Sequence, residues 1–217
     1  MQIPVYKKIL SYVLPITIEK TIGNNMTVLM LQLYCNQFML ATPRAIYSFG
    51  TRYSPYKKPL AQIRAELPRV KNFLQLGTGL GSSLKIIQDK YNLFPDAVLV
   101  DNDKDVLRFS LTYMDLNTHN NVEWKCADAV QFLNTNTKKF DLIGIDIFMD
   151  LVQPKFICTN DFINQCRQTL QPDGICLFNM ILENDNHIIE IEELMKTHFR
   201  KVSFILDKVN TYFICHR

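Results

Sequence analysis

From Val70 onward, apolar runs of strand length alternate with amphipathic stretches that have helical spacing. The strand-like runs lie at 70–76, 97–101, 122–126, 140–148, 174–181, 202–207 and 211–216. The helix-like stretches lie at 82–91, 104–114, 128–134, 160–170 and 187–199. This alternation predicts right-handed βαβ units and a largely parallel sheet with helices on both faces.

The last two strand-like runs are separated only by Lys208, Val209 and Asn210. A parallel crossover needs a much longer connection, so the last strand should be antiparallel to its neighbour. The expected fold class is therefore α/β, with a doubly wound, mostly parallel sheet of seven strands whose last strand is antiparallel.

The first 67 residues follow a different pattern. MTVLMLQLY (26–34) and QFMLAT (37–42) are rich in β-forming residues, and the intervening Cys35-Asn36 can make a tight turn, which predicts a β-hairpin. Segment 43–59 carries three prolines and several aromatic residues, so we expect an irregular connection that ends in a short helix near 60–67. We therefore divide the chain into an N-terminal β-hairpin subdomain with a linker helix (1–67) and an α/β domain (68–217).

Three glycines at alternate positions follow the first strand of the α/β domain, in FLQLGTGLGSS. Glycines at 77, 79 and 81 permit a tight turn and close approach of a ligand to the backbone, and the next helix supplies free N–H groups. Serine stands at 82, where the dinucleotide-binding pattern GxGxxG has its last glycine, which weakens an NAD interpretation. An ordinary strand–helix turn is the alternative explanation.

Aspartates follow the next three strand-like runs. Asp101 could accept hydrogen bonds from both hydroxyls of a ribose, while Asp103 is better placed to cap the next helix. Asp128 could accept a bond from an exocyclic amine such as that of adenine, or it could cap the following helix. Asp146 ends the run FDLIGID. Because ligands of open α/β sheets bind at the carboxyl ends of strands, the glycines and these carboxylates predict one site.

Composition excludes several other functions. A net charge of +3 over 217 residues is too small to predict nucleic acid or a membrane surface as the main partner, and the basic stretch at 52–71 is more simply a solvated face than an anion site. The first apolar run is too short and broken for a signal peptide or membrane span, and six cysteines without a CxxC pair fit a reducing compartment, so we expect a cytoplasmic protein. The histidines lack metal-ligand spacing, so no metal is expected, at positions 119, 187, 198 and 216.

The motifs LGTGLGSS, VLVDND, CADAVQFL, FDLIGIDIF and QPDGICLFNM resemble those of class I S-adenosylmethionine-dependent methyltransferases. More narrowly, they are similar to the spermidine synthase-like (aminopropyltransferase) branch, whose small β-domain and linker the hairpin and IYSFGTRY resemble. The resemblance implies that S-adenosylmethionine or its decarboxylated form binds to Gly77, Thr78, Gly79, Gly81, Asp101, Asn102, Asp128 and Ala129. It also implies that Asp146 takes a proton from an attacking amine.

The chain departs from that branch at positions that matter for the substrate. Leu80 replaces an aspartate that lies against the aminopropyl end and would repel a carboxylate, and Met149 replaces a second aspartate. Each lost charge-assisted contact is worth on the order of 1.5–3 kcal/mol, so aminopropyl transfer to putrescine is disfavoured. We expect the acceptor to contact Tyr47, Met149 and Asp150, the last only if its loop shifts.

The residues that follow Asp146 suggest a less polar acceptor pocket than a polyamine needs. Phe148 and Met149 would line this pocket, whereas Ile147 could equally be a core residue that continues the strand.

Three functions follow from these observations. The leading hypothesis is methyl transfer from S-adenosylmethionine to a small-molecule amine or hydroxyl, with Asp146 as base and no metal. The first alternative is aminopropyl transfer from decarboxylated S-adenosylmethionine to a changed acceptor. The second alternative is a cofactor-binding protein without catalysis that works as a dimer or a partner scaffold. The aromatic segment 44–60 could form a homodimer face or a substrate lid, and the sequence does not decide between them.

Overall fold

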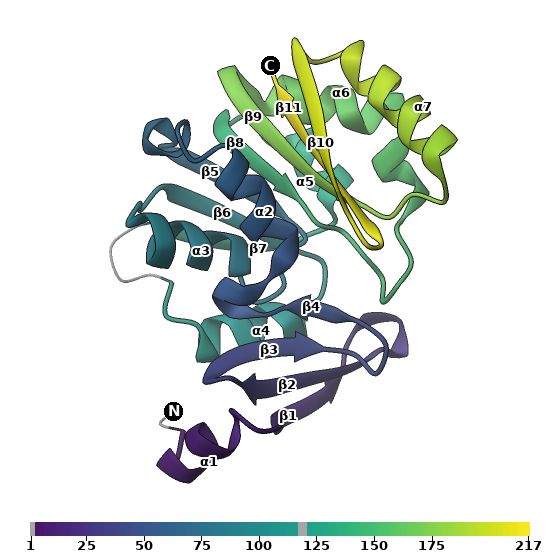
Figure 1. The fold of residues 1–217 in the computed structure, drawn as a ribbon. Coiled ribbons are helices and arrows are strands. Elements are labelled where there is room, and N and C mark those ends of the chain that lie inside the picture. The colour runs from purple at the N-terminus through teal and green to yellow at the C-terminus, as the bar shows by residue number, and fades with distance from the viewer. Residues whose placement is uncertain (1–2, 117–120) are drawn as a thin grey trace.

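The computed structural model describes residues 3–116 and 121–217 and contains a larger sheet and a smaller N-terminal sheet (Figure 1). The larger sheet has seven strands in the order β10-β11-β9-β8-β5-β6-β7. Its strands are β5 (Asn72–Leu76), β6 (Asp96–Asp101), β7 (Val122–Cys126), β8 (Phe140–Ile145), β9 (Leu170–Met180), β10 (Lys201–Asp207) and β11 (Asn210–His216). Strand β11 is antiparallel to both neighbours and the other pairs are parallel, which confirms the predicted fold class.

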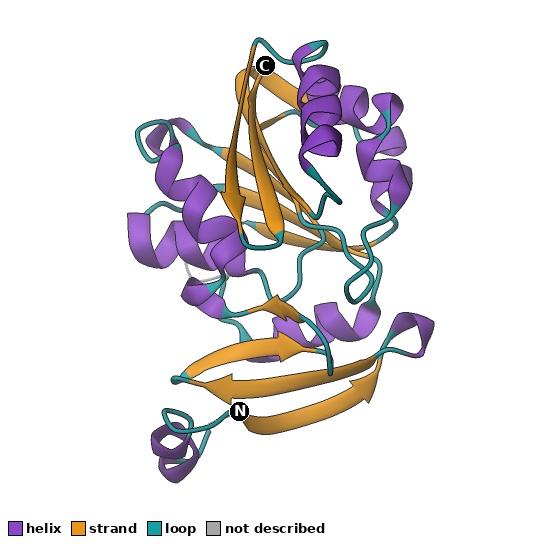
Figure 2. Ribbon diagram, turned by 45° about the vertical axis from the view of Figure 1, so that its right-hand side comes forward, coloured by secondary structure: helices purple, strands orange, loops and turns teal. Residues whose placement is uncertain are grey.

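Helices cover both faces of this sheet, as Figure 2 shows. They are α2 (Ser54–Gln62), α3 (Ser82–Tyr91), α4 (Lys104–Tyr113), α5 (Ala129–Thr135), α6 (Asn160–Thr169) and α7 (Asp185–Lys196). Side chains alternate along each strand, so β5 sends Leu74 and Leu76 into the core with α5, α6 and α7, and Phe73 into the core with α2 and α3. The helices from α3 to α7 begin and end within three residues of the predicted stretches.

The N-terminal sheet is larger than the predicted hairpin. It contains four antiparallel strands in sequence order, β1 (Ile16–Ile22), β2 (Val28–Tyr34), β3 (Gln37–Ala41) and β4 (Ile46–Ser48). The predicted turn between β2 and β3 is correct, because Cys35 and Asn36 both have the positive φ that a tight hairpin turn needs. Strand β1 was missed because its residues do not alternate cleanly between buried and exposed, and β4 because it has only three residues.

The predicted linker helix lies earlier than expected. Helix α2 begins at Ser54 and ends at Gln62, and only a short 3₁₀-helix (Leu67–Arg69) lies near the predicted end. Pro55 fits the first turn of α2, where a proline needs no N–H partner. Tyr56 and Leu60 are buried against the larger sheet, so this part of segment 44–60 packs in the chain's own core and is not a free dimer face.

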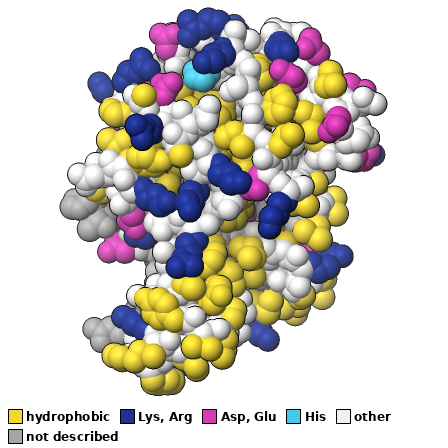
Figure 3. Space-filling view, viewed as in Figure 1, with side chains coloured by type: hydrophobic (Ala, Val, Ile, Leu, Met, Phe, Trp, Pro, Cys, Tyr) yellow, Lys and Arg dark blue, Asp and Glu magenta, His cyan; other side chains and the backbone are white. Residues whose placement is uncertain are grey.

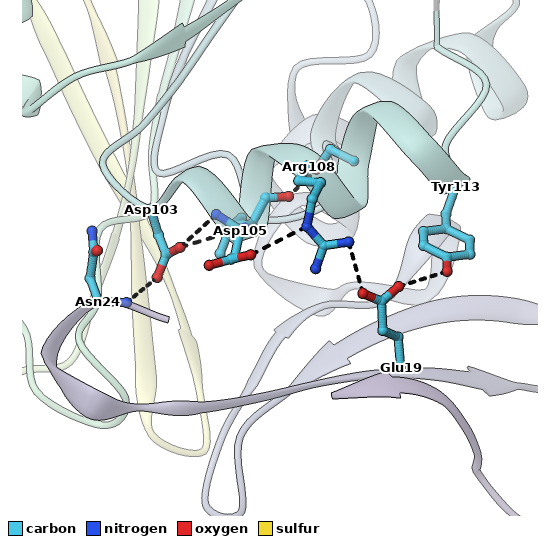
Figure 4. Close-up of polar contacts among 8 residues, drawn as sticks. Glu19, Asn24, Asp103, Asp105, Arg108 and Tyr113 are labelled. Atoms are coloured by element: carbon cyan, nitrogen blue, oxygen red, sulfur yellow. Dashed lines mark hydrogen bonds and ion pairs between the residues drawn. The ribbon is translucent and has the colours of Figure 1, made fainter. Parts of the chain in front are cut away.

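The two sheets meet through α4. Leu29, Leu31 and Leu40 of the N-terminal sheet pack with Val106 and Phe109 of α4. Figure 4 shows the polar contacts beside this apolar layer: Glu19 of β1 pairs with Arg108 at 2.8 Å and accepts a hydrogen bond from Tyr113 at 2.8 Å. In the same view, the backbone N–H of Asn24 donates to Asp103 at 2.6 Å. These contacts hold the N-terminal sheet over the carboxyl ends of the parallel strands.

Two features of the fold bear on the predicted organisation. The division into 1–67 and 68–217 stays a prediction, since α2 of the first part packs against α3 and β11 of the second. Hydrophobic side chains gather at the lower end of the molecule in Figure 3, where Figure 1 places the N-terminal helix α1 (Val5–Leu10). The exposed apolar side chains there include Val5, Tyr6, Ile9, Tyr12 and Val13.

Candidate active site

The glycine-rich loop passes very close to other parts of the chain. Gly77 has a φ of 77°, and a Cβ on it would lie 2.1 Å from the backbone oxygen of Asp146. A Cβ on Gly79 would lie 2.9 Å from the backbone oxygen of Tyr47. The serine at 82 is buried, and its hydroxyl lies 2.6 Å from that of Ser48. The loop is therefore packed between β8 and the end of β4, which explains the glycines by close backbone approach.

A cavity of about 700 Å³ opens where the carboxyl ends of the parallel strands face the N-terminal sheet. This volume lies within the range of small-molecule sites. Ten of the predicted site residues line the cavity: Tyr47, Gly77, Gly79, Asp101, Asn102, Asp128, Ala129, Asp146, Met149 and Asp150. The other two lie behind its wall, since the buried Thr78 side chain donates to the Val100 carbonyl and Gly81 packs under Leu116.

Asp101 ties the glycine-rich loop to the end of β6. Its Oδ2 accepts hydrogen bonds from the backbone N–H groups of Thr78 at 3.0 Å and Gly79 at 3.2 Å, and its Oδ1 accepts one from Asp103 at 3.0 Å. Burial raises the pKa of Asp101 to about 6, although these three bonds pull the pKa down. A carboxylate offers about four acceptor positions, so Asp101 has room for one further donor.

Both predicted roles of Asp128 are compatible with its position. Its Oδ1 accepts hydrogen bonds from the N–H groups of Val130 at 2.9 Å and Gln131 at 3.0 Å, which caps α5. The same residue lines the cavity, so its Oδ2 can serve a ligand while Oδ1 keeps the cap. Asp103 caps α4 as predicted, through Asp105 at 2.9 Å.

Asp146 is held by two donors that the sequence analysis missed. The Tyr53 hydroxyl donates to Oδ2 at 2.8 Å, and the Asn179 amide donates to Oδ1 at 2.7 Å. The Asn210 amide donates to Asn179 Oδ1 at 2.8 Å, which fixes the orientation of the Asn179 amide. Asn179 interrupts the apolar run of β9, and a polar residue buried in such a run needs a partner, so this signal was available.

The environment of Asp146 makes it a stronger base than an ordinary carboxylate. Burial raises its pKa to about 6, the charge of Asp101 adds to this, and the bonds from Asn179 and Tyr53 oppose it. Burial and the neighbouring Asp146 raise the pKa of Tyr53 well above its usual value, so Tyr53 keeps its proton and remains a donor. A fixed carboxylate with such a pKa, at the edge of a cavity, can take up a proton near neutral pH.

The loop after β8 places Asp150 against the N-terminal sheet. Its carboxylate forms an ion pair with Arg44 and accepts a hydrogen bond from the Thr42 hydroxyl, and its N–H donates to the Tyr47 hydroxyl. Asp150 has a φ of 57°, so it occupies a left-handed conformation that its short polar side chain tolerates. The sequence allows segment 44–60 to form a substrate lid but does not single out Arg44, which lines the cavity together with Tyr47.

A comparison with protein-family models covers the part of the chain that carries these strand-end carboxylates. A model of the Spermine/spermidine synthase domain matches residues 55–214 of the chain. The chain belongs to this family. The match includes the glycine-rich loop, Asp101, Asp128 and Asp146, and it leaves out Arg44 and Tyr47 of the N-terminal sheet.

Individual relatives carry aminopropyltransferase names. The polyamine aminopropyltransferase of Erwinia tasmaniensis is 26% identical over 147 residues, which are 65% of this chain and 50% of that protein. Polyamine aminopropyltransferase 1 of Aquifex aeolicus is 26% identical over 144 residues, 64% of this chain and 50% of that protein. The chain thus spans about half the length of the curated relatives it matches.

Solved structures show the same fold. A probable spermidine synthase from Corynebacterium glutamicum superposes with a TM-score of 0.78 at 19% identity, covering 94% of this chain and 81% of that one. The spermidine synthase from Thermotoga maritima has a TM-score of 0.68 at 14% identity, with 92% and 72% covered. Human methyltransferase-like protein 13 has a TM-score of 0.61 at 16% identity, with 74% and 78% covered. The fold is therefore shared between spermidine synthases and methyltransferases.

Of the two departures from the resemblance, Met149 lines the cavity and Leu80 lies outside its wall. Leu80 is fully buried and packs with Leu29, Leu40 and Phe109 between α4 and the N-terminal sheet. Ile147 was expected either to line the acceptor pocket or to continue the strand into the core. It does both, because it lines the cavity and packs against the core.

Two further findings concern metals and membranes. Within residues 3–116 and 121–217, no three His, Cys, Asp or Glu side chains gather as a metal site would require, and His119 lies outside these ranges. The helices in the same ranges include none that is both long and apolar enough to cross a membrane.

Proposed function

We propose that this chain is an aminopropyltransferase, which moves the aminopropyl group of decarboxylated S-adenosylmethionine to an amine with Asp146 as the general base. The observation that carries the proposal is the Asp146 carboxylate, held by Tyr53 and Asn179 at a cavity edge in a member of the Spermine/spermidine synthase family. Family membership favours this activity over the methyl transfer that led the sequence-based hypotheses.

The residues at the other end of the cavity fit an adenosine-type ligand. We assign Gly77 and Gly79 to close contact, because both line the cavity and have no side chain to keep a ligand from the backbone. We assign Asp101 to one ribose hydroxyl, since three of its acceptor positions are already used. Asn102 is the neighbour that would take the second hydroxyl, and Asp128 Oδ2 with Ala129 would contact the adenine. Thr78 and Gly81 act indirectly, by holding Asp101 and the loop in place.

Asp146 handles the proton of the reaction. The sulfonium supplies an electrophilic carbon and a leaving thioether, so the amine nitrogen forms a C–N bond while the C–S bond breaks and its electron pair goes to sulfur. The nitrogen must lose a proton, and Asp146 Oδ1 or Oδ2 accepts it. Tyr53 and Asn179 keep the carboxylate aimed at the amine.

Methyl transfer from intact S-adenosylmethionine is the second candidate, because the fold is shared with methyltransferases. Leu80 does not decide between the two, since it is buried in the apolar cluster outside the cavity wall. The two activities give products of different mass from the same amine, because one adds a methyl group and the other an aminopropyl group.

The deciding experiment combines binding with product analysis. Calorimetric titration should show tighter binding of decarboxylated S-adenosylmethionine than of the intact form, and mass spectrometry should detect an aminopropylated amine. A methylated product would support the second candidate, and binding of neither form would leave the scaffold hypothesis. Asp146→Asn should abolish turnover and keep binding, while Asp173→Asn, at an exposed position that tolerates a left-handed backbone, is the matched control.

We also propose that the chain works on a small-molecule acceptor and, as the sequence analysis anticipated, as a homodimer. Light scattering of the purified protein tests the second point. A monomer at the concentrations of the activity assay would contradict it, whereas the activity itself is judged from the product analysis.

A further inference from the structure

The acceptor end of the cavity holds two carboxylates, and only one of them is available for a substrate. Among the described residues that line the cavity, Asp101, Asp103 and Asp128 follow β6 and β7, at the end assigned to the adenosine. Asp146 and Asp150 follow β8. A diamine acceptor brings one amine to the base and a second, charged ammonium that needs its own carboxylate.

Asp150 is already paired within the protein. Arg44 forms an ion pair with its Oδ2, and the Thr42 hydroxyl donates to its Oδ1 at 2.5 Å. The Asp150 side chain is 13% exposed and the Arg44 side chain is 69% exposed, so the carboxylate is largely covered while the guanidinium borders on solvent. A second ammonium would have to displace Arg44 from Asp150 or share the carboxylate with it, and two positive charges on one carboxylate repel each other.

The pair is preassembled by its backbone. Thr42 Oγ1 accepts hydrogen bonds from the N–H groups of Arg44 at 3.2 Å and Ala45 at 2.9 Å, which closes the turn between β3 and β4. On the other side, the N–H of Met149 donates to the Val152 carbonyl at 2.9 Å, and the reverse bond is 3.0 Å. The backbones of both charged residues thus lie in closed turns, which bring Arg44 and Asp150 together without a ligand.

Most of the remaining wall at the acceptor end is apolar. Its apolar residues come from the N-terminal sheet, the loop after β8 and the ends of β9 and β10: Ile46, Phe148, Met149, Leu151, Phe156, Ile181 and Val209. The polar groups beside them are uncharged and belong to Tyr47, Tyr53, Asn179 and Asn210. Several of the apolar side chains are exposed at the mouth of the cavity, so an ammonium there would keep part of its water but would find no free counter-charge, which is unfavourable. An alkyl or aromatic group would instead gain from the removal of its surface from water.

We propose that the acceptor is a primary monoamine whose far end is an uncharged alkyl or aromatic group, and that the Arg44–Asp150 pair excludes diamines. This inference rests on the proposed transferase function and specifies its substrate. Arg44 acts here as a specificity-determining residue, through the carboxylate that it neutralises.

The test compares two acceptors of equal chain length, butylamine and putrescine, with decarboxylated S-adenosylmethionine as donor. We expect kcat/KM to be higher for butylamine by about tenfold or more, the discrimination that one unpaired charge gives. Arg44→Met keeps the aliphatic stem, frees Asp150 and should move the ratio toward putrescine by a similar factor. Arg52→Met, at an exposed position outside the cavity wall, should leave the ratio unchanged.

The preference for a monoamine can also be tested by binding alone, without turnover. Calorimetry with the nucleoside thioether product present should show tighter binding of butylamine than of putrescine, and Arg44→Met should reverse the order. Preference of the unchanged protein for putrescine, or failure of butylamine to bind, overturns the assignment. Alkylation of putrescine in preference to butylamine would overturn only the substrate inference and would still support the transferase, so the two failures are distinguishable.

Discussion

Gly77 lies so close to Asp146 that a Cβ on Gly77 would stand 2.1 Å from the Asp146 backbone oxygen. The contact joins the two parts of the site, since Gly77 begins the loop held by Asp101 and Asp146 carries the base. The backbone N–H of Asp146 also donates to the Leu76 carbonyl at 2.9 Å, so β5 and β8 pair up to this point.

Gly77→Ala should therefore destabilise the protein and misplace Asp146. The alanine would keep a φ near 77°, which L-residues disfavour, and its methyl group would push β8 away. We expect a loss of about 2–4 kcal/mol in the free energy of unfolding, measured by urea denaturation. Ser83→Ala is the control, because the buried Ser83 hydroxyl has no partner among the described residues and its removal should cost little. A change below the error of the measurement for Gly77→Ala would contradict the packing argument.

The pH dependence of turnover should report the Asp146 carboxylate. Because its pKa is raised to about 6, activity should fall as the pH drops through this value and the base becomes protonated. Tyr53→Phe removes a bond to the charged form, so the pKa should rise further and the acidic limb of kcat/KM should move up by about one pH unit. Tyr212→Phe, which removes a bond to Asp207 at 3.0 Å, is the control and should leave the limb in place. An unshifted limb in Tyr53→Phe would show that another group governs it.

Stability should change with pH in the opposite sense to activity. The folded-state pKa of Asp146 lies above the ordinary value of 3.8, so between about pH 4 and 6 the folded protein binds a proton that the unfolded chain has lost. The contribution of this group to stability is present below pH 4 and is lost as the pH rises through 6. Asp146→Asn removes the buried charge, so it should stabilise the protein at pH 7 by about 1–2 kcal/mol while abolishing turnover. Thermal unfolding at pH 4 and pH 7 measures the difference, and a destabilised Asn variant at pH 7 would refute it.

Restoring the family's aspartate at position 80 should fail for a structural reason. Leu80 packs in an apolar cluster with Leu31 and Val106, so Leu80→Asp would bury a carboxylate without a counter-charge. We expect a loss of more than about 3 kcal/mol and a loosened N-terminal sheet. Leu80→Met keeps the volume and should cost less than about 1.5 kcal/mol. Chemical denaturation of the two variants checks this prediction, and equal stabilities would mean that the loop can turn residue 80 toward the cavity.

Local sequence patterns predicted most of the fold and part of the site. The strand and helix periodicities placed α3 at its observed bounds and located the ends of β6 and β7, while the run predicted for β8 extends three residues beyond its observed end. Because parallel strands share the direction of their carboxyl ends, Asp101, Asp128 and Asp146 could be expected on one edge before any contact was known. Strand β1 could not be predicted in this way, because its residues alternate only weakly between buried and exposed. It forms a strand because it pairs with β2, which is a long-range interaction.

The sequence by itself determined the strands and helices of the α/β domain and the tight turn at Cys35-Asn36, since those depend on neighbours a few positions away. Only the tertiary structure decided which side chains meet: Tyr53 reaches Asp146 from 93 positions away, and Thr42 reaches Asp150 from 108. It also decided that Leu80 faces the core while Arg44 faces the cavity, because the way two sheets pack depends on the shape and burial of both surfaces together. Long-range packing of this kind leaves no periodic trace in the chain, and it is what assembles the base and the acceptor pocket.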